Sequence, residues 1–99
     1  MDGSDPNKPK AARAVAMIVN RRGLHARASA KFVETVARFP CEVSVTKGEN
    51  TVSGRSIMGL MMLGASMGST IELSAEGPEA DAALTALLTL IAGRFHEDA

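Results

Sequence analysis

The sequence is poor in the residues that build disulfides, metal cages and aromatic contact surfaces. Its 99 residues include one cysteine, two histidines, three phenylalanines and no tryptophan or tyrosine. One cysteine cannot close an intramolecular disulfide, which predicts a fold held by packing alone in a reducing compartment. One cysteine and two widely spaced histidines do not make the ligand set of a structural zinc site. We therefore expect no metal site and no cofactor.

An excess of one charge and a long apolar run are missing too. Eleven Lys and Arg residues balance eleven Asp and Glu residues, whereas a protein that binds nucleic acid through phosphates needs a basic excess. No apolar run approaches the roughly 20 residues that cross a bilayer. The polar start of the chain also lacks the apolar segment of a secretory signal. We expect a cytoplasmic protein that binds no nucleic acid and does not enter the membrane.

The length suits one small domain with a single core. Residues 1–12 show no periodicity and contain two prolines, which predicts a disordered N-terminal extension. Residues 13–95 are expected to form the domain, and residues 96–99 a polar tail. Nothing in the pattern favours an oligomer, so we expect a monomer.

The hydrophobic pattern changes its period along the chain. Strands are predicted at 14–20 (a buried strand), 41–46, 51–53 and 70–75, and helices over about three turns from 25, at 57–63 and from 78 to 93. The order is therefore β-α-β-β-α-β-α. Most of these strands alternate apolar and polar residues and need a cover on one face only. This pattern predicts an α+β fold with an antiparallel sheet in a two-layer sandwich.

Helix periodicity also predicts which side chains face the core. The helix after His25 is expected to bury a stripe widened by Phe32 and Val36, namely Ala26, Ala30, Val33 and Ala37. Ser29 and Lys31 are then expected on its exposed side. Glu79 and Asp81 are expected in the first turn of the last helix, where acidic side chains suit the helix dipole.

Residues 20–27, Asn-Arg-Arg-Gly-Leu-His-Ala-Arg, place a histidine and an arginine where a glycine loop enters a helix. The free N–H groups and the positive dipole end of a helix N-terminus favour an anion. A neutral imidazole has a nucleophilic lone pair at neutral pH. His25 is thus a candidate to attack a phosphoryl group, with the backbone N–H groups of Ala26 and Arg27 and the Arg27 guanidinium stabilising its charge.

The plainer interpretation of His25 is a solvated or capping side chain, and spacing alone favours it. No second histidine or carboxylate lies nearby in sequence to complete a hydrolytic triad. That lack suits a protein that carries a group better than one that hydrolyses it.

Residues 54–64 form a second informative segment, apolar on nearly every side and with three methionines. Core packing is the default for such a stripe, but a short helix on a small domain cannot bury every side, so a docking surface is a competing interpretation. Ser56 is expected to cap this helix. It is also a candidate phosphorylation site, with the phosphate on the helix dipole and beside Arg55.

Three segments together resemble the HPr family, the histidine phosphocarriers of the bacterial phosphoenolpyruvate-dependent phosphotransferase system. Residues 23–27 resemble its active-site segment, residues 56–64 its regulatory-serine helix and residues 71–77 its last strand. The resemblance runs from about Val15 to Phe95, so residues 13–95 are HPr-like. One departure is Ala28, where the family usually has proline; we expect the first helical turn to survive it.

The resemblance implies an open-faced β-sandwich, a four-stranded antiparallel sheet covered on one face by three helices. It implies that His25 accepts a phosphoryl group on Nδ1 from Enzyme I, charged by phosphoenolpyruvate, and passes it to an EIIA-type acceptor, with Arg27 as the cation beside the phosphate. Ser56 matches the site that an HPr kinase/phosphorylase modifies in some lineages. The expected docking residues are Leu24, Ile57, Met58 and Met61.

Alternatives to a relay of phosphoryl groups for sugar import stay open at this point. The chain is expected to be a non-autonomous transfer component, not a free-standing enzyme. It could instead be a regulatory protein-binding module of a nitrogen-type phosphotransferase system, with docking that depends on phosphorylation state. A small-molecule-binding α+β domain is a third class, although the sequence offers no polar pocket residues that favour it.

Overall fold

The computed structural model describes residues 11–99. Its elements are β1 (Ala11–Met17), α1 (Ala26–Val36), β2 (Glu42–Lys47), β3 (Asn50–Ser53), α2 (Ile57–Met62), β4 (Thr70–Glu76), α3 (Ala80–Ala92) and a short turn, η1 (Arg94–His96). The predicted order β-α-β-β-α-β-α is confirmed. The disorder predicted for residues 1–10 lies outside the described residues.

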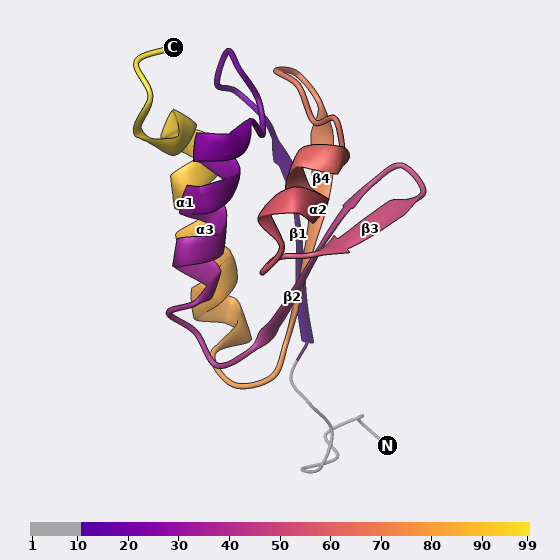
Figure 1. The fold of residues 1–99 in the computed structure, drawn as a ribbon. Coiled ribbons are helices and arrows are strands. Elements are labelled where there is room, and N and C mark those ends of the chain that lie inside the picture. Colours follow the sequence, from indigo (N-terminus) through magenta and orange to yellow (C-terminus); the bar gives the residue numbers. More distant parts are fainter. Residues whose placement is uncertain (1–10) are drawn as a thin grey trace.

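The four strands form one antiparallel sheet in the order β1-β4-β2-β3. Helices α1 and α3 pack side by side on one face of the sheet, and α2 packs against α1 and β3 (Figure 1). Among residues 11–99, no helix lies on the other face. The open-faced α+β sandwich is therefore confirmed.

Alternation along the inner strands builds the core between sheet and helices. Val43 and Val45 on β2, and Ile71 and Leu73 on β4, are all buried, while their neighbours in sequence face the open side. The largest fully buried side chains are Phe32 of α1 and Phe95 of η1. Burying a side chain of this size stabilises the fold by roughly 1.5–3 kcal/mol, so each of these rings helps to hold the helical layer on the core.

The first strand differs from its prediction. It runs from Ala11 to Met17, so it begins inside the segment expected to be disordered and ends before Asn20. As an edge strand it buries one face only, and Val15 and Met17 are 63% and 56% exposed. A short apolar run does not distinguish a buried strand from an edge strand followed by a buried loop residue. Here Ile18 and Asn20 are fully buried but lie beyond the strand.

The buried face of α1 is only partly the predicted one: Phe32 and Val36 are fully buried as expected, and Ala30 and Val33 are half-buried. Ala26 and Ala37 are exposed, and Ser29, expected outside, is fully buried. The buried face follows the bulky apolar side chains and consists of Ala28, Ser29, Phe32, Thr35 and Val36. Alanine has little apolar area, so a stripe of alanines carries less free energy than the stripe of Phe32 and Val36.

The last helix begins later than predicted. Glu79 precedes α3 as its N-cap residue in a left-handed conformation, with φ at 60°. It does not lie in the first turn, as expected, whereas Asp81 does. The chain reaches α3 through Gly77, whose φ is 116°, so the turn after β4 determines where the helix begins.

Candidate functional site

His25 is the N-cap residue of α1. Its backbone is extended, with φ −73° and ψ −179°, and its Nδ1 accepts a hydrogen bond from the backbone N–H of Arg27 at 3.3 Å. The loop before it passes close to the segment after α2: the Leu24 N–H donates to the Ala65 carbonyl at 2.9 Å. Gly23 makes this possible, because a Cβ at this position would lie 2.3 Å from that carbonyl oxygen. The glycine loop thus fixes where the imidazole stands.

The other ring nitrogen of His25 contacts the C-terminal segment. Nε2 is hydrogen-bonded to the Glu97 carboxylate, and both side chains are largely buried. The amide of Asn20 donates to the same carboxylate at 3.1 Å and to the Gly23 carbonyl at 2.8 Å. An ionised carboxylate only accepts, and Nδ1 accepts from a backbone donor, so these partners assign the neutral-ring proton to Nε2. Nδ1 keeps its lone pair.

The segment that delivers Glu97 is a left-handed turn. Arg94, Phe95 and His96 have φ angles of 59°, 54° and 64°, a conformation that costs roughly 1–2 kcal/mol per non-glycine residue. Burial of the Phe95 ring offsets this cost. Lys31, expected on the exposed side of α1, is half-buried and donates to the Phe95 carbonyl at 2.6 Å. Figure 1 shows the result: the C-terminal turn lies beside the start of α1.

The predicted polar tail, residues 96–99, is therefore part of the site. Sequence reasoning missed Glu97, Asn20 and Lys31, because the contacts of Glu97 and Lys31 with their partners span 72 and 64 residues. The polar tail itself gave no signal, and the only apolar anchor near it is Phe95, the residue that precedes it. The backbone oxygen of Ala99 also accepts from the Arg21 N–H at 3.1 Å.

The electrostatics beside His25 favour an anion. A shallow hollow of about 400 Å³ is lined by four cationic side chains and the C-terminal segment, namely Arg21, Arg22, Arg27 and Lys31 with His96, Glu97, Asp98 and Ala99. Burial raises the pKa of the Glu97 carboxyl, but hydrogen bonds from His25 and Asn20 and the charges of His25 and Lys31 outweigh it and lower that pKa below its ordinary value. Glu97 is thus ionised at neutral pH.

Ala26 and Arg27 lie in the first turn of α1, as predicted. The backbone N–H of Arg27 already points at Nδ1, and both side chains are exposed. A group bound to Nδ1 would therefore meet this N–H group, the positive end of the helix and a free guanidinium.

The predicted docking residues separate into two sets. Leu24 is buried, at 5% exposure, so its assignment to a docking surface was wrong: it packs inward below the loop. The other three expected residues are exposed and lie on α2 together with the exposed Met62. We call the set the methionine surface: Ile57, Met58, Met61 and Met62. Met61 and His25 line one shallow hollow of about 260 Å³, so this surface adjoins the histidine.

Ser56 caps α2 as predicted, with its Oγ accepting from the Gly59 N–H at 2.9 Å. Arg55, expected beside it, donates its guanidinium to the carbonyls of Phe39 and Cys41 at 3.2 and 3.0 Å. The expected Arg55–phosphate pair therefore has no preformed geometry. Cys41 is buried just before β2, and burial raises the pKa of its thiol.

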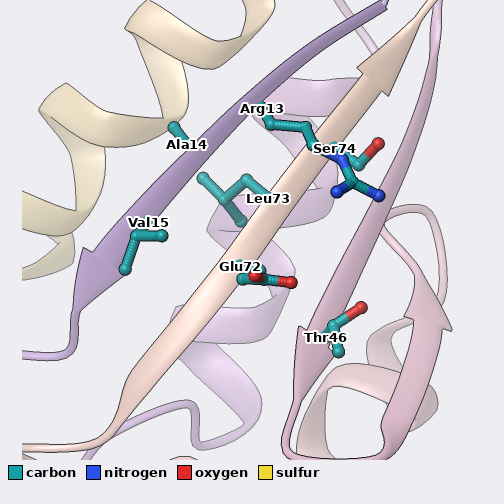
Figure 2. A pocket seen from close by; sticks show the side chains of 7 residues that line it. All are labelled: Arg13, Ala14, Val15, Thr46, Glu72, Leu73 and Ser74. Atoms are coloured by element: carbon teal, nitrogen blue, oxygen red, sulfur yellow. The ribbon is translucent and has the colours of Figure 1, made fainter.

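A second hollow, of about 300 Å³, lies on the open face of the sheet. Figure 2 shows the Arg13 side chain reaching from β1 across β4 toward Ser74, with Glu72 and Thr46 farther along. None of the predicted site residues lines it. Within residues 11–99 no cluster of three or more potential metal ligands occurs, and no helix is long and apolar enough to cross a bilayer.

Comparison with known proteins agrees with this geometry. The family model described as "PTS HPr component phosphorylation site" matches residues 12–93. The phosphocarrier protein HPr of Neisseria meningitidis is 52% identical over 81% of this chain and 90% of its own length. The phosphocarrier protein NPr of Shewanella violacea is 42% identical over 81% and 88%.

Solved structures give the same answer. An HPr from Thermoanaerobacter tengcongensis superimposes with a TM-score of 0.85 at 41% identity, over 89% of this chain and 99% of that one. A crystal structure of an HPr dimer from the same organism gives a TM-score of 0.70 at 45% identity, over 81% and 92%. The chain therefore belongs to the HPr/NPr family of phosphocarriers of the phosphotransferase system.

Proposed function

We propose that His25 is the phosphoryl carrier of this protein. It accepts the group on Nδ1 from Enzyme I, charged by phosphoenolpyruvate, and passes it to an EIIA-type acceptor. The observation that carries the proposal is the arrangement of the imidazole: Nε2 is hydrogen-bonded to Glu97, and Nδ1 keeps a lone pair at the N-terminus of α1.

The transfer needs little from this chain beyond that arrangement. The Nδ1 lone pair forms a bond to phosphorus while the bond between phosphorus and the donor breaks, and the electron pair of the broken bond stays with the donor. The Arg27 N–H already points at Nδ1, and the exposed Arg27 guanidinium can follow the phosphoryl oxygens. Donor and acceptor supply the remaining machinery of the in-line transfer.

Ala28 does not disturb this arrangement. Where the family usually has proline, this chain has a fully buried alanine, and α1 still begins at Ala26. The expectation that the first helical turn survives the departure is confirmed. We propose that His25 with Ala28 after Arg27 still holds the phosphoryl group on Nδ1 and can pass it to an acceptor.

Both partners would dock on the methionine surface. Its residues are 42–81% exposed, and one of them, Met61, lines a hollow together with His25. Methionine side chains are flexible and adapt to more than one partner, which suits a carrier that must bind donor and acceptor in turn. Such brief encounters need little area, under about 1,200 Å². We propose that the protein acts as a monomer in these encounters, because a second copy on this surface would cover the docking residues.

Regulation through Ser56 is a second part of the proposal, favoured by the position of its hydroxyl. Ser56 caps α2 within the methionine surface, so a phosphate added by an HPr kinase/phosphorylase would place about two negative charges among exposed apolar side chains. State-dependent docking of this kind also fits the nitrogen-type alternative, and both HPr and NPr relatives occur.

The test is the intact mass of the protein after incubation with phosphoenolpyruvate and Enzyme I from the same genome. We expect one phosphoryl adduct that brief acid treatment removes, and none in His25→Ala. Thermal unfolding of the variant checks that the fold is intact, because His25→Ala also removes the partner of the Glu97 carboxylate. An adduct of equal extent in His25→Ala would overturn the assignment. Addition of EIIA-type domains to the labelled protein would then identify the acceptor.

A further inference from the structure

The Glu97 contact is not required by a simple relay, which needs only one free ring nitrogen. Yet three residues in a left-handed conformation and the buried ring of Phe95 bring this carboxylate to Nε2. Asn20, itself fully buried, holds the second carboxylate oxygen at 3.1 Å. The side chains of His25 and Glu97 are only 15% and 13% exposed. The contact is therefore supported from both sides and shielded from water.

We infer that Glu97 is a positioning residue of the phosphoryl transfer, which keeps the proton of His25 on Nε2 before, during and after the transfer. This inference rests on the proposed function of His25. It concerns the ring nitrogen that does not react, and it assigns a chemical role to the C-terminal segment.

The first consequence concerns acceptance of the group. A neutral imidazole exchanges between two tautomers, and only the one with its proton on Nε2 has a lone pair on Nδ1. The Glu97 carboxylate can accept a proton from Nε2–H but cannot donate one. It therefore favours the reactive tautomer, as the partners of a metal-bound or catalytic histidine fix its tautomer elsewhere.

The second consequence concerns release. When Nδ1 bonds to phosphorus and Nε2 keeps its proton, the ring carries one positive charge and the phosphoryl group two negative charges. On transfer to the acceptor the N–P bond breaks and its electron pair returns to Nδ1, so the leaving group is neutral imidazole. Without the Nε2 proton the leaving group would be an imidazolate, a much poorer one. Glu97 stabilises the protonated ring and so keeps the carrier ready to transfer.

The surroundings keep Glu97 charged without competing for Nε2. The charged and titratable groups that face it are those of the hollow beside His25. Arg21 and Arg22 come from the loop after β1, Arg27 and Lys31 from α1, and His96 and Asp98 from the C-terminal segment. Four of these are cationic side chains, so the hollow favours the ionised form of the Glu97 carboxylate.

The experiment compares wild type with Glu97→Gln, with Glu97→Asp as the conservative variant and Asp98→Asn as the matched control. Asp98→Asn removes the same charge from the neighbouring residue of the segment. Nitrogen-15 NMR of the unphosphorylated imidazole measures which nitrogen carries the proton. We expect the Nε2–H form in wild type and in Asp98→Asn, a several-fold larger share of the Nδ1–H form in Glu97→Gln, and recovery in Glu97→Asp.

The second readout is the phosphorylated protein. Its hydrolysis accelerates as pH falls, because the ring must be protonated to leave. We expect this profile to move about one pH unit lower in Glu97→Gln, because an adjacent carboxylate shifts a titration by that order. Transfer to the EIIA-type acceptor at neutral pH should slow about tenfold. Asp98→Asn should change neither.

The outcomes separate the inference from the proposed function. If Glu97→Gln and Asp98→Asn behave alike in the NMR measurement, Glu97 does not position the ring and the inference is wrong, whatever the phosphorylation result. If wild type takes no phosphoryl group, the proposed function fails, and the NMR measurement alone decides whether Glu97 sets the tautomer. A changed tautomer with unchanged hydrolysis and transfer would also overturn the role in transfer.

Discussion

Two side chains of this protein cap helices and are candidates to carry phosphate, and they do so very differently. His25 caps α1 with a 3.3 Å bond from Arg27, and its second nitrogen is bound to Glu97. Ser56 caps α2 with a 2.9 Å bond from Gly59. At His25 the capping hydrogen bond to Nδ1, the nitrogen that would react, is long, and four cationic side chains lie nearby. The second cap, at Ser56, is tight and lies among exposed apolar side chains.

The difference indicates two different uses of a helix N-terminus. At His25 the positive end of the helix, the free guanidinium and the lone pair converge, which suits a group that arrives and leaves often. At Ser56 the hydroxyl is engaged by the helix itself, and Arg55 is turned to the carbonyls of Phe39 and Cys41. In the described part of the chain, no preformed cation site awaits a phosphate on Ser56. Its main effect would be to add charge to the docking surface.

The largest expected effect distinguishes His25 from Ser56 directly, by which of the two takes the phosphoryl group. His25→Ala should lose all labelling from phosphoenolpyruvate and Enzyme I, because the hydroxyl in the first turn of α1, that of Ser29, is fully buried and donates to the Leu24 carbonyl. Ser56→Ala should be labelled as fully as wild type in the same reaction. Intact mass measures both. Acid-labile label in His25→Ala would show that a different residue carries the group.

The next effect sharpens the role of the cations. Arg27→Ala should slow transfer from Enzyme I by about 10- to 100-fold, because a charge-assisted hydrogen bond to the phosphoryl group is lost. Arg38→Ala, at the other end of the same helix, is the matched control and should have little effect. Rapid-quench kinetics give the rates. Equal rates for the two variants would mean that Arg27 does not reach the phosphoryl group.

These predictions rest on a site of which the sequence predicted only one half. The loop 20–27 is local: a glycine, a histidine and an arginine within five residues already give the cap and the anion site. Glu97 lies 72 residues from His25, and only the buried Phe95 and the left-handed turn bring it back. No local pattern encodes such a return, so the tail was predicted as merely polar.

The same limit explains the errors inside the fold. Strand and helix periods predicted the order of the four strands and three helices, because they depend on neighbours in sequence, although β1 lies at Ala11–Met17 and η1 was not predicted. Burial depends on what packs against the element, so Ser29 was predicted outside and Leu24 at the surface, although both are buried. The hydroxyl of Ser29 is accommodated by donating to the Leu24 carbonyl at 3.1 Å. That bond satisfies the polar group and ties the loop to the helix.

A smaller effect tests the tightness of the second cap. Ser56→Ala should lower the free energy of unfolding by about 1 kcal/mol, the usual loss when an N-cap hydroxyl is removed. Ser56→Asp should keep most of that stability, because aspartate is a good N-cap, while it adds charge to the methionine surface. Urea denaturation measures both. The control is Ser74→Ala on the open face of the sheet, and an equal loss there would deny Ser56 a special role.

The smallest effect is the contribution of Glu97, the hydrogen-bond partner of His25, to the free energy of unfolding. Within the residues that the structure describes, Ser56 has no such carboxylate partner. Because the pKa of the Glu97 carboxyl is lowered in the folded protein from its ordinary value of 4.5, the folded state binds its proton less readily than the unfolded state. The stabilisation from Glu97 is then fully present above about pH 4.5 and is lost as pH falls through the lowered pKa. Glu97→Gln should therefore unfold at lower urea than wild type at pH 6, and the gap should narrow as the pH falls below 4.5. A gap that stays equal above and below that pH would show that the carboxylate charge contributes nothing to the fold. The contact with His25 would then serve the histidine alone.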